Sequence, residues 1–149
     1  MTTTSGIVLT DEIVEHVNGA QPAGKSLAIA YVDAAGRPRM SLRGSTHVHS
    51  PDQLAIWVRK AQGGIADAIR EHPAVGLLYR DNDTRTTYVF SGRARIEADE
   101  AVRSEVFEAC PQFEQDHDPE RNGVAVLIDL DEVKGGTVGG TQVSMSRDG

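Results

Sequence analysis

The sequence is poor in cysteine, in aromatic residues and in long apolar runs. Among its 149 residues there is one cysteine, Cys110, which excludes an internal disulfide and a zinc site built from cysteines of one chain. Aromatic residues make up only 5% of the chain. No stretch approaches the ~20 apolar residues of a membrane-spanning helix, and the start lacks the basic and apolar segments of an export signal. We therefore expect a cytoplasmic protein with no membrane partner.

Positive charge is also scarce, since 15 Lys and Arg residues stand against 22 Asp and Glu, for a net charge of -7. Proteins that bind nucleic acid need a basic surface to meet the phosphate backbone, so the composition argues against a nucleic-acid partner. The hydrophobic fraction of 39% is ordinary for a globular chain. The length is that of one domain with a real core, which we place over residues 1–149.

Strand patterns dominate the middle of the chain. Alternating or apolar runs bounded by Gly, Pro, Asn and Asp predict strands that follow one another through short turns, which favours antiparallel pairing. The predicted order is a helix, three strands, a short helix, two strands, a helix and one or two closing strands. The predicted parts are an N-terminal helix within 1–20, a barrel core over 26–96 with a short helix at 64–72, a helix at 99–110, and a closing strand and tail over 123–149. This succession predicts a mainly β protein, a closed or partly closed barrel with peripheral helices.

The segment "WVRKAQGGIADAIREHP" (57–73) places two basic residues and then two glycines between a strand and a helix. Glycines allow a close approach of the backbone to a ligand, and a helix N-terminus attracts anions. On the strand "RMSLRGS", Arg39, Ser41 and Arg43 share one face, while Met40 and Leu42 point the other way. These residues are consistent with a phosphate site, but also with a plain loop whose helix is capped by Asp67 and a solvated strand face. The residues alone leave both interpretations open.

The succession of motifs resembles the pyridoxamine 5′-phosphate oxidase-like, FMN-binding split-barrel family. The segments "GRPRMSLRG", "LAIWVRK", "IREHPAVGLLYRD" and "TTYVFSGRARIE" occur in the order and at the spacing typical of that family. They cover roughly residues 27–96. The resemblance implies a split barrel with antiparallel strands, a homodimer, and FMN bound at the dimer interface.

The resemblance also implies roles for individual residues. Arg39, Met40, Ser41 and Leu42 would line the phosphate and the edge of the isoalloxazine, and Trp57 and Val58 would lie along the flavin ring. Gln62, Gly63 and Gly64 would form the phosphate loop, with Arg43, Arg59 and Lys60 supplying charge. Thr87 would contact the ring from the partner subunit.

Two departures from the family pattern refine this prediction. Well-known members carry a serine and two basic residues where this chain has "QGG", and authentic pyridoxamine phosphate oxidases have a C-terminal tryptophan and arginines that this chain lacks. The vitamin B6 reaction is therefore not expected. We predict an FMN-dependent oxidoreductase acting on a small molecule, with NAD(P)H as a candidate donor. The alternative is a non-catalytic protein that binds or senses a flavin, the deazaflavin F420 or haem.

Other polar residues give weaker signals. His47 and His49 alternate onto one strand face, a spacing that two metal ligands could use, but no third ligand is evident, and we predict no metal site. Cys110 is expected to be a half-buried small apolar residue on a helix rather than a nucleophile. No catalytic side chain is predicted, because hydride transfer to or from a flavin needs no protein acid or base.

Overall fold

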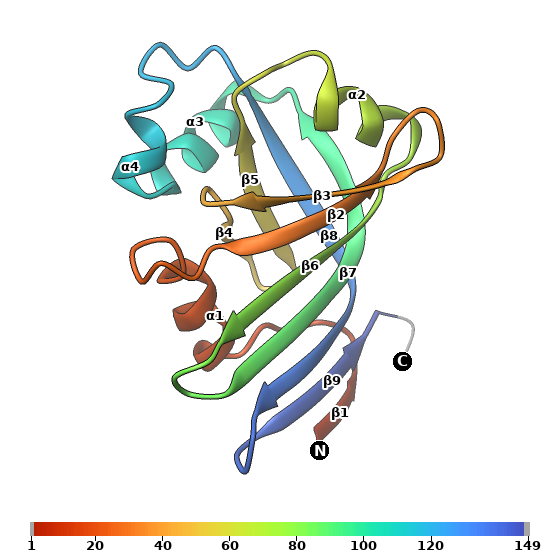
Figure 1. Cartoon of the computed structure of the whole chain (residues 1–149), viewed down its shortest axis with the longest axis vertical. Helices are drawn as coiled ribbons and strands as arrows, with labels where there is room; N and C mark the ends of the chain where they lie inside the picture. The colour runs from red at the N-terminus through yellow and green to blue at the C-terminus, as the bar shows by residue number, and fades with distance from the viewer. Residues whose placement is uncertain (1, 148–149) are drawn as a thin grey trace.

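The computed structural model describes residues 2–147, which form nine strands and four helices (Figure 1). The strands are β1 (Thr2–Ser5), β2 (Leu27–Val32), β3 (Pro38–Arg43), β4 (His47–Ser50), β5 (Gln53–Val58), β6 (Ala74–Asp81), β7 (Thr86–Glu97), β8 (Val124–Thr137) and β9 (Gln142–Ser146). The helices are α1 (Asp11–Asn18), α2 (Gly64–Glu71), α3 (Glu100–Ala109) and α4 (Gln112–Gln115). None of the helices within the described residues is long and apolar enough to cross a membrane.

The strands form one strongly curved sheet in the order β1-β9-β8-β7-β6-β2-β3, with β5 joined to β8 and β4 joined to β5. Every pairing is antiparallel except that of β1 with β9. In residues 2–147 no ladder connects β3 to β4 or β5, so the barrel is open on that side. The prediction of a mainly antiparallel, partly closed barrel with peripheral helices is confirmed.

Local sequence signals account for the ends of the helices. The Thr10 hydroxyl accepts a hydrogen bond from the Ile13 amide at 3.2 Å, and Asp99 does the same for the Val102 amide at 3.1 Å. These are ordinary N-caps for α1 and α3. Helix α2 differs, because its N-cap is Gly63 and no side chain bonds to the free amides of its first turn. The interpretation in which Asp67 caps this helix does not hold, since the Asp67 carboxylate accepts a hydrogen bond from Arg70 at 2.9 Å instead.

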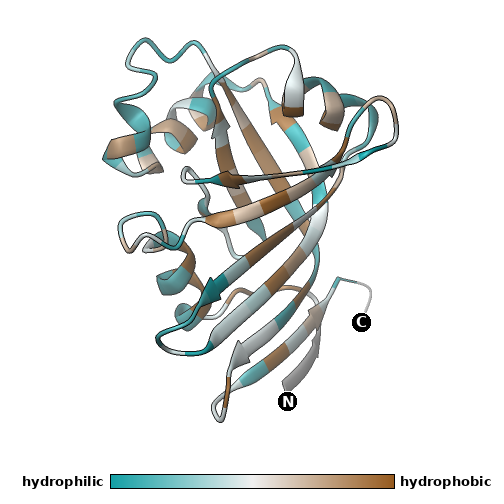
Figure 2. Cartoon of the chain, in the orientation of Figure 1, coloured by the Kyte–Doolittle hydropathy of each residue, from teal (hydrophilic) through white to brown (hydrophobic). Residues whose placement is uncertain are grey.

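The core is divided in two by the sheet. The larger cluster fills the barrel, where alternate residues of β7 such as Tyr88 and Phe90 point inward, as expected of core aromatics. A smaller cluster lies outside the barrel, between α3 and strands β5 and β8. Both faces of β5 are therefore covered, which explains why Leu54 through Val58 are all buried (Figure 2).

Several elements differ from the predicted order. Four strands rather than three lie between α1 and α2, because the turn after β3 leads into the separate short strand β4. The region 1–20, predicted as helical, contains β1 as well as α1, and the short helix α4 was not predicted. The sequence signals for β1 and α4 are weak, because β1 consists of only four polar residues and α4 is a single turn. The closing segment forms two strands, β8 and β9, where the sequence predicts one or two.

His47 on β4 is buried, 3% exposed, and its Nδ1–H donates to the Ser45 carbonyl oxygen at 2.8 Å. Its Nε2 has no partner within the described residues. Burial lowers the pKa of His47; the Ser45 hydrogen bond opposes this effect and neighbouring His49 adds to it. In the unfolded chain His47 therefore takes up a proton near pH 6.5, whereas in the folded chain it does so only at lower pH. The folded state consequently loses stability as the pH falls below 6.5.

We expect the free energy of unfolding to fall between pH 6.5 and 5 by up to about 1.4 kcal/mol per pH unit, and His47→Gln to flatten that slope. Urea titrations at pH 7, 6 and 5 measure it. The matched control is His72→Gln, because His72 is exposed after α2 and this variant should keep the wild-type slope. Equal slopes for wild type and His47→Gln would contradict the prediction.

Candidate functional site

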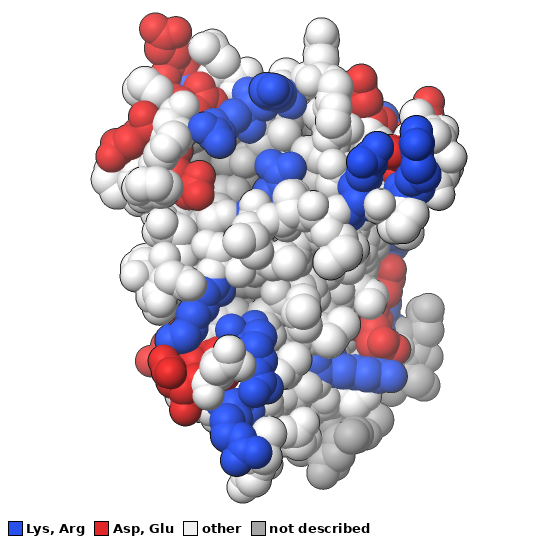
Figure 3. Space-filling model, in the orientation of Figure 1, with Lys and Arg blue, Asp and Glu red and all other residues white. Residues whose placement is uncertain are grey.

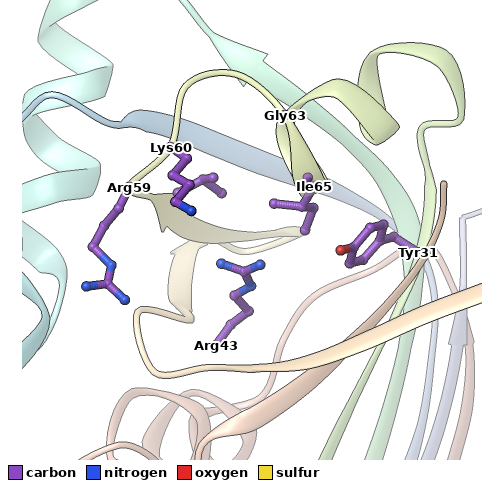
Figure 4. Close-up of a pocket in the computed structure, with 8 residues that line it drawn as sticks. Tyr31, Arg43, Arg59, Lys60, Gly63 and Ile65 are labelled. Carbon is purple, nitrogen blue, oxygen red and sulfur yellow. The ribbon is translucent and has the colours of Figure 1, made fainter. Parts of the chain in front are cut away.

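A cavity of about 430 Å³ opens between the ends of β3 and β5 and the start of α2 (Figure 4). We call it the β3–α2 pocket. Six predicted residues line it: Arg43, Val58, Arg59, Lys60, Gly63 and Gly64. Tyr31 from β2 and Ile65 from α2 complete the lining and were not predicted. The fold thus brings together the two basic segments that the sequence separates by more than a dozen residues.

Arg43 lies at the centre of the pocket. Figure 4 shows its guanidinium, the Lys60 amino group and the Tyr31 ring directed into the same space, with Arg59 along one side. Burial lowers the pKa of Arg43 and the positive charge of Arg59 adds to this effect, while Tyr31 and Glu114 oppose it; the arginine stays charged at neutral pH. These basic groups favour an anionic ligand, because an anion would relieve their mutual repulsion.

Two buried polar atoms on the face of β3 that carries the pocket residue Arg43 lack protein partners. Arg43 Nε and Ser41 Oγ are both buried, and neither is hydrogen-bonded to any described residue. Leaving a buried donor unsatisfied costs about 1–3 kcal/mol, and more when the group is charged. Such atoms in a native protein indicate a missing partner, and Arg43 shows that this partner is an acceptor. The pocket therefore fits a phosphate oxygen.

The start of α2 supplies backbone donors to the same cavity. Gly63 has φ 77° and ψ 177°, a conformation open essentially to glycine alone, and Gly64 has φ 48°. A Cβ atom at either position would meet nothing within 4 Å, so the glycines are required by the backbone conformation and not by crowding. With no side-chain cap, the first amides of this eight-residue helix stay available to an anion.

The other predicted β3 residues lie around the pocket rather than in it. Arg39 lines an adjoining hollow of about 400 Å³ that shares Tyr31 and Gly64 with the β3–α2 pocket, and its Nε donates to Asp33 at 2.8 Å. Met40 and Leu42 point to the opposite face of β3, where they are 74% and 72% exposed. The opposite direction of Met40 and Leu42 agrees with the alternation of the strand, and their predicted contact with a flavin stays a prediction.

Gln62 and Thr87 lie outside the pocket. Gln62 is exposed in the loop before α2 and does not line the cavity. Thr87 lies in a separate hollow formed by β7, β8 and β9, where its hydroxyl accepts a hydrogen bond from Arg80 at 2.8 Å. The predicted contact of Thr87 with a flavin from the partner subunit stays a prediction.

The side chain of Trp57 lies away from the β3–α2 pocket. Its side chain is 4% exposed and belongs to the smaller core cluster, with the ring edge-on to Phe107 at 4.9 Å between centroids. Its Nε1 donates to the buried carboxylate of Asp118 at 2.8 Å. The ring therefore packs under α3, outside the barrel, and does not line the β3–α2 pocket, whereas the next residue, Val58, does.

The remaining sequence signals have structural roles. Cys110 is buried and free, and burial raises the pKa of its thiol to about 12, so it is no nucleophile at neutral pH. Among the described residues, no group of three or more His, Cys, Asp or Glu side chains is arranged to hold a metal ion. His47 and His49 lie on β4, and neither lines the β3–α2 pocket.

Comparison with known proteins identifies structures that share this fold. No family model and no curated protein sequence matches the chain. A pyridoxamine 5′-phosphate oxidase-related, FMN-binding protein from Nostoc punctiforme has a TM-score of 0.68 and 15% identity, over 87% of this chain and 84% of that one. A putative pyridoxamine 5′-phosphate oxidase from Lactobacillus delbrueckii has a TM-score of 0.62 and 24% identity, over 85% and 93%. HupZ from Group A Streptococcus has a TM-score of 0.64 and 18% identity, over 87% and 97%.

These structures share less than a quarter of their residues with this chain, so the likeness concerns the fold. By its fold, the chain is a split barrel of the pyridoxamine 5′-phosphate oxidase-like type, in agreement with the resemblance found in the sequence.

Proposed function

We propose that the chain is an FMN-dependent oxidoreductase whose β3–α2 pocket holds the phosphate of the flavin. The observation that carries the proposal is the guanidinium of Arg43, which is directed into a cavity that is also lined by Arg59, Lys60 and the uncapped start of α2 (Figure 4). A phosphate monoester carries close to two negative charges at neutral pH, and an arginine with helix amides is a common set of partners for it. The structural likeness to the FMN-binding protein from Nostoc punctiforme supports the same assignment.

In this proposal FMN supplies the transfer of a hydride or of electrons, and the protein supplies position and charge. Arg43 and the amides after Gly63 hold the phosphate, which fixes the distance from the pocket to the isoalloxazine. Arg59 and Lys60 raise the local positive potential and thereby favour the anionic reduced form of a bound flavin. Tyr31 covers one wall of the pocket and shields the phosphate from water.

The visible absorption spectrum of the purified protein tests the proposal, followed by titration with FMN and removal of unbound flavin. We expect flavin bands that remain after dialysis, and oxidation of NADH or NADPH by the loaded protein. Riboflavin, which lacks the phosphate, should bind at least ~10-fold more weakly, because it cannot use the charged partners. A protein that binds neither FMN nor the deazaflavin F420 would contradict a flavin phosphate site. Binding of FMN without turnover would instead assign a storage or sensing role. If neither flavin binds, titration with haem would test whether the protein binds haem.

A further inference from the structure

The turn after β3 contains a glycine whose missing side chain makes room for two polar neighbours. Gly44 directly follows Arg43, and its φ is not positive, so the backbone conformation does not call for a glycine there. A Cβ atom on Gly44 would overlap Oε1 of Glu114 and would lie 3.1 Å from Cγ of Gln21. Gly44 is therefore needed for the space that these two side chains occupy.

Glu114 and Gln21 come from segments far apart in the sequence. Glu114 lies on α4 and Gln21 in the loop between α1 and β2, and Figure 1 shows the end of β3 between these two segments. Helix α4 is tied to the end of α3 by the Gln115 side chain, whose Nε2 donates to the carbonyl oxygens of Cys110 at 2.9 Å and Glu108 at 3.1 Å. The Glu114 carboxylate is thus placed over Gly44 by an anchored turn of helix.

Neither side chain is engaged by the protein. Both are half-buried, and within residues 2–147 neither the Glu114 carboxylate nor the Gln21 amide makes a hydrogen bond or an ion pair. A carboxylate partly withdrawn from water is costly unless hydrogen-bond donors reach it. A carboxylate only accepts hydrogen bonds, whereas an amide both donates and accepts them. The pair is therefore equipped to bind a group with hydrogen-bond donors.

This pair lies next to the β3–α2 pocket without lining it. Burial lowers the pKa of Arg43, and the charge of Glu114 is one of the effects that oppose it, so the two charged groups are within electrostatic reach of each other. They do not form an ion pair in the described part of the chain. Figure 3 shows acidic side chains over α3 and α4 at the upper left, beside basic side chains nearer the middle of the same face. The negative charge thus adjoins the proposed phosphate site.

We infer that Glu114 and Gln21 form a subsite for the hydroxyl groups of the chain that carries the bound phosphate. A second anionic group would be repelled by the Glu114 carboxylate, whereas hydroxyl groups donate to it, as ribose hydroxyls do to an acidic residue in dinucleotide sites. The inference rests on the proposed function, in which Arg43 holds the phosphate of FMN. The group attached to that phosphate is the ribityl chain, a polyol.

The binding of riboflavin, lumiflavin and inorganic phosphate to Glu114→Ala tests the inference. Riboflavin carries the polyol without the phosphate, and lumiflavin has the ring without either. We expect riboflavin and FMN to bind about 10- to 100-fold more weakly, because hydrogen bonds to a charged group are lost. Lumiflavin should bind as before, and phosphate should bind no more weakly, because a nearby negative charge is removed. Flavin fluorescence measures the first three, and calorimetry measures phosphate.

Glu105→Ala is the matched control, because it removes the same charge from an exposed position on α3 and should change none of these affinities. Circular dichroism checks that each variant is folded. Two results for Glu114→Ala would overturn the inference. One is tighter binding of both riboflavin and phosphate, which would make Glu114 only a source of repulsion. The other is an equal loss of riboflavin and lumiflavin, which would place Glu114 at the ring.

Gly44→Ala displaces the carboxylate without changing any charge. Its Cβ would overlap Oε1 of Glu114, at the free end of a flexible side chain, so the side chain is expected to move away. Gly44→Ala should therefore weaken riboflavin as Glu114→Ala does, and the double variant should show no further loss, because both changes remove the same contact. Fully additive losses would contradict a contact made by Glu114 across Gly44.

Ribitol 5-phosphate separates this inference from the proposed function. It carries the polyol and the phosphate without the ring, so its binding should weaken in Glu114→Ala as that of FMN does. A protein that binds ribitol 5-phosphate in this way but no flavin would keep the subsite and contradict the flavin. Flavin binding that ignores Glu114→Ala would overturn the subsite and keep the proposed function. Binding of neither ligand would contradict both.

Discussion

Replacing Arg43 with glutamine should weaken FMN binding about 10- to 100-fold and leave the binding of riboflavin nearly unchanged. A hydrogen bond between charged groups contributes about 1.5–3 kcal/mol, and each 1.4 kcal/mol corresponds to a factor of ten in affinity. Riboflavin lacks the phosphate that Arg43 is proposed to hold. The ratio of the two dissociation constants, measured by flavin fluorescence at fixed ionic strength, is therefore the informative quantity.

Arg37→Gln is the matched control, because it removes the same charge from the neighbouring hairpin at a side chain that is 70% exposed. It should leave the ratio unchanged. An equal loss of affinity for FMN and riboflavin in Arg43→Gln would place Arg43 at the ring or in a supporting role. Raising the salt concentration should weaken FMN binding to the wild type more than to Arg43→Gln, since fewer charges remain to be screened.

The sequence predicts most of this pocket because its parts are local patterns. The alternation along β3 correctly places Arg43 and Leu42 on opposite sides, and the glycine pair marks the start of α2. Tyr31 was missed because it is an ordinary aromatic residue at the end of a strand. Only the β2–β3 register, which pairs it with Arg39, carries it to the pocket. A search for residues opposite the basic face in the neighbouring strand would have found it.

Trp57 shows where sequence patterns stop being informative. Alternation assigns side chains to two faces, but it says which face is inside only when the other is polar. On β5 both faces are apolar, because α3 covers the side that would otherwise meet water. That helix lies more than 40 residues further along the chain, so nothing near Trp57 in the sequence indicates that its ring packs outside the barrel.

Replacing Asp118 with alanine should lower the free energy of unfolding by about 3–5 kcal/mol. Its carboxylate is 7% exposed and accepts hydrogen bonds from Trp57 Nε1 at 2.8 Å, from the Gly123 amide at 2.9 Å and from the Asn122 amide at 3.0 Å. Burial alone would raise the pKa of Asp118, but these hydrogen bonds and the nearby charge of Arg103 together lower it. Removing the acceptor leaves three donors unsatisfied, each at a cost of about 1–3 kcal/mol, partly offset by water.

Urea denaturation followed by Trp57 fluorescence measures this loss, because Trp57 is the single tryptophan. Asp116→Ala is the control: Asp116 is exposed in the same loop, and its loss should cost less than about 0.5 kcal/mol. A loss that small in Asp118→Ala as well would show that the loop contributes little to stability.

The same variant also decides the role of Trp57. If the ring is held by Asp118 as part of the core, Asp118→Ala that is still folded should bind FMN with nearly the wild-type affinity, because the β3–α2 pocket contains neither residue. A folded variant that loses its affinity for FMN would instead indicate that Trp57 contacts the flavin. The end of β5 would then have to rearrange when FMN binds. Stability and cofactor affinity are therefore expected to separate along β5, between Trp57, which packs under α3, and Val58, which lines the pocket.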